Sequence, residues 1–115
     1  MSCFPDDEIE EMKMLFGPLQ QGQEGGATFI LISRLALPSG CTPSHVDALL
    51  CPTLRDGYTS RLFFAQRVQK PTVPAPNWNG AARILERDWH AFSWRVSAQP
   101  MRLAQLVAEH LRGLR

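Results

Sequence analysis

The spacing of apolar residues predicts a helix over Asp6–Phe16, DDEIEEMKMLF. Ile9, Met12 and Phe16 recur every three or four positions, which places them on one face of a helix. Acidic residues crowd the first turn, where the helix dipole favours negative charge. A Gly-Pro pair follows directly and ends the helix. The polar, glycine-rich stretch Gln20–Gly26 is then expected to be a connection.

A second helix is predicted over Pro100–Leu114. Proline suits the first position of a helix, and Gly113 stands where a C-terminal cap is expected. We expect His110 to pack within the apolar stripe of this helix rather than to bind a ligand. The predicted buried stripe comprises Leu103, Leu106, Val107, His110 and Leu114.

Three stretches between the helices have the composition of β-strands: Ala27–Leu37, His45–Cys51 and Arg61–Val68. The first is rich in β-branched and aromatic residues. Short turns separate the three, which predicts an antiparallel meander. Apolar residues occupy both faces of the first strand, so both sides of the sheet should be covered. We expect one face to carry Phe29, Leu31, Leu35 and Leu37 and the other to carry Ile30 and Ile32.

The segment Pro71–Trp94 has a different character, because it holds three prolines and all three tryptophans of the chain. Each proline removes a backbone donor and fixes φ, so we predict a long irregular flap here. Trp78, Trp89 and Trp94 should anchor it against the sheet or the last helix, with at least two of them mostly buried. The predicted fold class is therefore α+β, one domain over residues 1–115: N-terminal helix, antiparallel meander, long irregular flap and C-terminal helix.

Composition limits the classes of function. The net charge of +1 is spread along the chain, which argues against nucleic-acid or electrostatic membrane binding. The longest apolar run, Ala27–Ile32, is too short to span a membrane, and the acidic N-terminus does not resemble a signal peptide, so a cytoplasmic location is expected. Cys3, Cys41 and Cys51 are odd in number and lack CxxC spacing, so we expect no disulfide framework, no metal site and no cofactor.

Several short motifs follow one another in an order known from one family. LALPSG, HVDALLCP and DGYTSRLFF match a meander in which a Gly-Tyr-Pro turn precedes the third strand, although Thr59 replaces that proline. Pro76-Asn77 matches the end of a His-Pro-Asn triplet, with Ala75 in place of the histidine; Gly80 and Trp89 match a later glycine and tryptophan. Together these motifs resemble the ubiquitin-conjugating-enzyme (UBC) fold, specifically the small bacterial UBC-like proteins.

The chain departs from that family at the nucleophile. Where the resemblance places the family cysteine this chain has Arg83, and no cysteine follows Cys51. A thioester carrier needs a thiol, because a thiolate both attacks and leaves well. Cys41 and Cys51 are expected to be buried structural thiols.

Three residues remain as candidates for chemistry. The resemblance implies that Asn77 directs its amide at a developing oxyanion, although an asparagine after proline is also typical of a turn. His90 and Ser93 are three apart, so on a helical turn they would share a face, and a histidine can activate a hydroxyl nucleophile.

The resemblance implies a component of a bacterial ubiquitin-like protein conjugation pathway, with the ubiquitin-like protein and its activating enzyme as partners. Two mechanisms stay open: a carrier that forms an oxyester on a hydroxyl such as Ser93, and a non-catalytic adaptor. The alternative is an unrelated small α+β domain that binds a peptide. The sequence therefore leaves open whether the protein is an enzyme.

Overall fold

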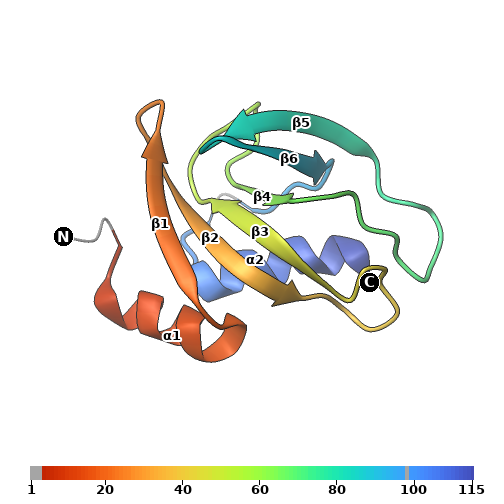
Figure 1. The fold of residues 1–115 in the computed structure, drawn as a ribbon, viewed down its shortest axis with the longest axis horizontal. Helices are drawn as coiled ribbons and strands as arrows, with labels where there is room; N and C mark the ends of the chain where they lie inside the picture. The colour runs from red at the N-terminus through yellow and green to blue at the C-terminus, as the bar shows by residue number, and fades with distance from the viewer. Residues whose placement is uncertain (1–3, 98) are drawn as a thin grey trace.

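The computed structural model describes residues 4–97 and 99–115 (Figure 1). Six strands form one antiparallel sheet in the order β1-β2-β3-β4-β6-β5, with a helix before the first strand and another after the last. The elements are α1 (Asp6–Phe16), β1 (Leu19–Glu24), β2 (Ala27–Ala36), β3 (His45–Cys51), β4 (Arg61–Phe64), β5 (Trp78–Ile84), β6 (Arg87–Phe92), α2 (Leu103–Leu111) and a terminal 3-10 turn (Arg112–Leu114).

This architecture overturns the predicted fold class. The described chain is dominated by its six-stranded sheet, and two short helices flank it in sequence, so it is not a UBC-like α+β fold of three-stranded meander, long flap and helix. The segment predicted as a flap contains the β5–β6 hairpin, and β6 joins β4 through the single pair Phe64–His90. The stretch predicted as a polar connection, Gln20–Gly26, contains all of β1 except its first residue.

The hairpin forms because the prolines lie outside it. Pro76 is the last of them, and β5 begins two residues later, so both strands keep all their backbone donors. Leu85 and Glu86 make the turn with φ of 52° and 66°, the left-handed values of a two-residue turn that matches strand twist. Such turns usually carry Asn or Gly, and their absence hides this hairpin in the sequence.

The central meander β2-β3-β4 confirms the three predicted strands and their antiparallel pairing. Two details differ. The strands β2 and β4 end earlier than predicted, at Ala36 instead of Leu37 and at Phe64 instead of Val68. The register also shifts between Ile32 and Leu35. At this irregularity Arg34 has φ of 54°, and its N–H donates to Asp47 Oδ1 over 2.9 Å. Leu35 consequently packs with Ile32 on the helical side of the sheet, rather than with Phe29 as the alternation predicted.

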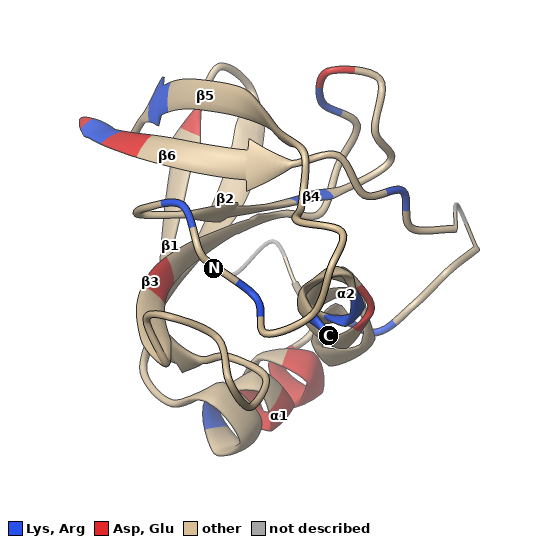
Figure 2. Ribbon diagram, turned by 90° about the vertical axis from the view of Figure 1, so that its right-hand side faces the viewer, with Lys and Arg blue, Asp and Glu red and all other residues tan. Residues whose placement is uncertain are grey.

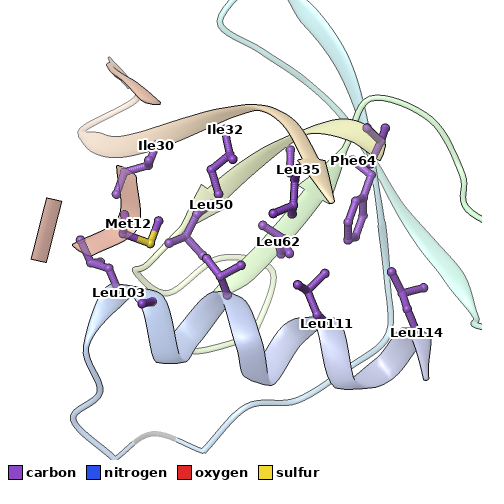
Figure 3. Packing of buried hydrophobic residues seen from close by; sticks show 14 of the residues in the cluster. Met12, Ile30, Ile32, Leu35, Leu50, Leu62, Phe64, Leu103, Leu111 and Leu114 are labelled. Atoms are coloured by element: carbon purple, nitrogen blue, oxygen red, sulfur yellow. The ribbon is translucent and has the colours of Figure 1, made fainter. Parts of the chain in front are cut away.

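The helical side of the sheet holds the larger core (Figure 3). Side chains of β2, β3 and β4 meet those of both helices there, among them Met12, Ile30, Ile32, Leu50, Leu62, Phe64, Leu103, Leu111 and Leu114. The α2 stripe is buried largely as predicted, although Leu106 is only half-buried and the helix begins at Leu103 instead of Pro100. Fully burying each aliphatic side chain of this kind stabilises the fold by about 1.5–3 kcal/mol.

The opposite side of the sheet is covered by the hairpin, which lies across the strands from the helices (Figure 2). Trp89 is only 1% exposed there, and its Nε1–H donates to the carbonyl of Ile84 over 3.0 Å. The two faces of β2 are therefore both covered, as its sequence predicted. Trp78 and Trp94 are half-buried, and Trp94 donates to the Glu109 carbonyl over 2.8 Å, so the expected anchoring of the tryptophans is confirmed.

The tip of the hairpin reaches the first strand of the sheet. Leu85 N–H donates to Glu24 Oε1 over 3.1 Å, and a side chain at Gly22 would come within 2.7 Å of the Leu85 methyl. Glycine at position 22 therefore leaves room for the Leu85 side chain, which would have to shift if position 22 carried a Cβ. The sheet is curled so far that its two edges meet at this corner.

The left-handed turn gives a stability prediction. Replacing Glu86 with glycine should raise the free energy of unfolding by about 1 kcal/mol, because a side chain is strained at φ of 66° and glycine is not. Urea denaturation measures the change. Glu86→Ala removes the same carboxylate but keeps Cβ, so this control should bring no gain; an equal gain in both variants would contradict the strain argument.

His110 gives a pH prediction. Its ring is 3% exposed, Nε2 lies 2.9 Å from Ser60 Oγ, and burial with the nearby Arg61 charge lowers its pKa from 6.5 to about 4. Between pH 6.5 and pH 4 the histidine is protonated in the unfolded chain but neutral in the folded chain. The free energy of unfolding therefore decreases as the pH falls through this window, by about 3 kcal/mol in all.

Urea denaturation at a series of pH values, with His110→Gln beside the wild type, measures this contribution. In the variant, the free energy of unfolding should depend less on pH between pH 6.5 and pH 4, by the contribution of one histidine. This difference does not depend on the stability of the variant at pH 7. Parallel pH dependences in the two proteins would show that His110 is not the group responsible.

Candidate functional site

The structure separates the two residues predicted to act as a pair. His90 lies in strand β6 opposite Ala81 and Phe64, while Ser93 follows the end of that strand. In an extended chain residues three apart point to opposite sides and stand about 10 Å apart, so the expected His–Ser pairing on a helical turn is wrong. His90 Nδ1 is instead buried and has no hydrogen-bond partner in the part of the chain that the structure describes.

The partner of Ser93 is a tyrosine from the turn between β3 and β4. Ser93 is exposed, and its Oγ lies 3.0 Å from the Tyr58 hydroxyl. Tyr58 itself is only 8% exposed. The Thr59 hydroxyl donates to the carbonyl of Val96 over 3.0 Å, which holds the same turn against the segment after β6. The hydroxyl of Ser93 therefore stands at the surface above a nearly buried phenol.

A buried arginine organises the other side of that phenol. Arg61 donates through Nη2 to Asn79 Oδ1 over 2.9 Å and through Nη1 to Asp56 Oδ2 over 3.2 Å. Asn79 in turn donates through Nδ2 to the Tyr58 hydroxyl over 3.1 Å. The Arg61 side chain is 4% exposed, so these partners and the Phe92 carbonyl replace the water that its charge has lost.

Gly80 makes room for this arginine. A Cβ at position 80 would lie 3.1 Å from the Arg61 guanidinium, which is tighter than ordinary contact. The glycine that the resemblance placed before a nucleophile thus has a packing reason of its own. A side chain there would require the Arg61 guanidinium, which donates to Asn79, to shift by a few tenths of an ångström.

The electrostatic surroundings favour the ionised form of Tyr58. The hydrogen bonds with Ser93 and Asn79 lower the pKa of the phenol, and the positive charges of Arg61 and Arg95 lower it further. The two guanidinium carbons lie 4.2 and 4.8 Å from the ring centroid. A lowered pKa raises the fraction of Tyr58 that is phenolate at a given pH, and the phenolate can accept a proton from the nearby Ser93 hydroxyl.

Asn77 lies beside Ser93 but is not part of this network. The Ser93 N–H donates to the Asn77 carbonyl over 2.8 Å, which joins the start of β5 to the end of β6. The Asn77 side chain is exposed, and within residues 4–97 and 99–115 no hydrogen bond of its amide is found. The geometry therefore brings Asn77 and Ser93 together and leaves His90 apart.

The residues at the expected nucleophile and the cysteines lie elsewhere. Arg83 is exposed on β5 and pairs with Asp88 over 3.1 Å. Cys41 is buried, its pKa is raised by burial, and its thiol donates to the Leu114 carbonyl over 3.4 Å. Cys51 is buried as well, while Cys3 lies outside the described residues.

Tyr58, Asn79 and Arg61 were missed by the analysis of the sequence. They are brought together by β6 pairing with β4, which sequence spacing does not show. One signal was present, because Arg61 opens the otherwise apolar strand β4, RLFF, and a charge at the start of such a strand needs buried partners.

Two further observations bound the chemistry of the described chain. No group of three or more His, Cys, Asp or Glu side chains within it is arranged to hold a metal ion. None of its helices has the length and apolar character needed to cross a membrane.

Comparison of the chain with known protein families, with curated proteins and with solved structures finds no match in any of the three.

Proposed function

We propose that this protein is a cytoplasmic component of a bacterial ubiquitin-like protein conjugation pathway and carries the ubiquitin-like protein on the Ser93 hydroxyl as an oxyester. The motifs that resemble small bacterial UBC-like proteins support the pathway. The fold lends no support, because it differs from the UBC-like arrangement. The observation that carries the mechanism is the 3.0 Å contact between the exposed Ser93 hydroxyl and the Tyr58 phenol.

The transfer follows from this contact. The ubiquitin-like protein arrives as a thioester on its activating enzyme, and Ser93 Oγ attacks the thioester carbonyl. Tyr58, in its phenolate form, takes the Ser93 proton and passes it to the departing thiolate. A C–O bond forms and a C–S bond breaks, so the products are the oxyester on Ser93 and the free thiol of the activating enzyme.

The neighbours of the pair have separate roles. Asn79 and Arg61 hold the Tyr58 oxygen in place and stabilise its negative charge, because one donates to it and the other lies over its ring. The free amide of Asn77, next to Ser93, is the donor available to the oxyanion that forms during attack.

The second candidate is a non-catalytic adaptor for the ubiquitin-like protein or its activating enzyme. Its support is the exposure of large apolar side chains outside the Ser93 site, since Met14 is 87% and Leu15 62% exposed on α1. Single exposed apolar residues are common, but adjacent ones on one helix favour a contact surface. In this mechanism the Tyr58 network only fastens the hairpin to the sheet.

The carrier mechanism predicts a reductant-resistant adduct when the protein is incubated with the activating enzyme, the ubiquitin-like protein and ATP. Hydroxylamine or mild base should release it, and Ser93→Ala should abolish it. Tyr58→Phe should slow its formation by a factor of about 10²–10⁴, the usual contribution of a general base. Asn77→Ala should slow it by a factor on the order of 100, the effect of losing one oxyanion donor.

The matched control is Ser97→Ala, which removes a nearby exposed hydroxyl and should leave the adduct unchanged. Mass spectrometry of the adduct locates the linkage. An adduct that reductant releases and that Cys41→Ser or Cys51→Ser abolishes would contradict the mechanism. Stable binding of either partner without an adduct would replace the carrier with the adaptor.

A further inference from the structure

An open groove lies between the end of the meander and the start of the hairpin, and Ser93 is not among the residues that line it. It has a volume of about 430 Å³ and is bounded by residues 67–70 on one side and 72–78 on the other. Its apolar residues are Val68, Val73, Ala75, Pro76 and Trp78. Val68 is 2% exposed and forms the base, while Val73 is 92% exposed.

The walls of this groove, named here the 67–78 groove, are held by the rest of the fold. Gln69 exchanges two backbone hydrogen bonds with Thr42, of 2.8 and 2.9 Å. Pro71 lies against Gly40 so closely that a Cβ at Gly40 would come within 2.9 Å of it. Trp78 is wedged against Phe92, with ring centroids 5.3 Å apart and the planes at 74°. These contacts fix the 67–70 wall and the Trp78 end of the second wall, which lowers the entropic cost of binding there.

The charges at the groove are of one sign. Arg67 and Lys70 both line it, and neither makes an ion pair among the described residues. Most other arginines of the described chain, among them Arg83, Arg87 and Arg102, do make one. The apolar residues of the 67–78 groove can contact aliphatic groups of a ligand, and the two unpaired cations can contact its carboxylates. The groove is therefore complementary to a ligand that carries both kinds of group.

We propose that the 67–78 groove binds an extended peptide segment of a partner protein, in which an apolar side chain is flanked by acidic residues. The apolar side chain lies over Val68 between Val73 and Trp78, and the carboxylates pair with Arg67 and Lys70. A nucleic acid fits less well, because two cations neutralise few phosphates and the groove base is aliphatic. The site does not require Ser93 to react.

A selection from a random peptide library displayed on phage, with the folded protein as bait, tests the ligand chemistry. The enriched sequences should combine aliphatic or aromatic residues with Asp or Glu. A synthetic, fluorescein-labelled peptide of the enriched sequence then gives the dissociation constant by anisotropy. Enrichment of basic sequences, or of none, would overturn the proposal.

Variants locate the binding. Arg67→Glu with Lys70→Glu should weaken the peptide at least tenfold, and Val73→Ser, an exposed position that folding does not need, should weaken it several-fold. The matched control is Arg34→Glu with Arg115→Glu, which changes the net charge equally at exposed positions outside the groove that make no ion pair among the described residues. Equal loss in both double variants, unchanged binding in the first, or full competition by oligothymidine would contradict the assignment.

Ser93→Ala separates this inference from the proposed carrier function. The variant should bind the peptide as tightly as the wild type while forming no oxyester. Loss of peptide binding in Ser93→Ala would place the peptide at the Ser93 site instead of the 67–78 groove.

Discussion

The structure depends on a strand that is apolar on both faces. β2 places Ile30 and Ile32 toward the helices and Phe29 toward the opposite side, and β3 and β4 continue both apolar surfaces. Water must be excluded from both, since each aliphatic side chain contributes about 1.5–3 kcal/mol only when it is buried. Two short helices cover one of these surfaces. The β5–β6 hairpin covers the other.

The candidate site results from the position of the β5–β6 hairpin on this second surface. Strand β6 of the hairpin pairs with β4 at one residue pair. This pairing places Asn79, the Phe92 carbonyl and Ser93 beside the turn that contains Tyr58. The hairpin also provides two of the acceptors of the buried Arg61 guanidinium, Asn79 Oδ1 and the Phe92 carbonyl, and Asp56 in the β3–β4 turn provides the third. Arg61 therefore contacts both the hairpin, through Asn79 and the Phe92 carbonyl, and the ring of Tyr58.

Local patterns predicted the local elements and failed where distant segments meet. The periodicity of α1 and the alternation in β3 fixed both elements to the residue, because their own side chains decide their burial. The hairpin escaped prediction because its turn, Leu85-Glu86, has no Asn or Gly, and because the prolines at 71–76 suggested irregular structure for the strands that follow. Ser93 was named as a candidate with the wrong partner, since only the pairing of β6 with β4 brings Tyr58 to it.

The central claim, that Tyr58 is a phenol prepared to take the proton of Ser93, has a direct test because Tyr58 is the only tyrosine of the chain. Ultraviolet absorbance of phenolate, followed against pH while circular dichroism monitors folding, gives its pKa without interference from another tyrosine. We predict a midpoint below the ordinary value of 10.0, shifted upward in Ser93→Ala and Asn79→Ala, because each removes a hydrogen bond that lowers it. A midpoint at or above 10.0 in the folded protein, or one that neither substitution moves, would contradict the account.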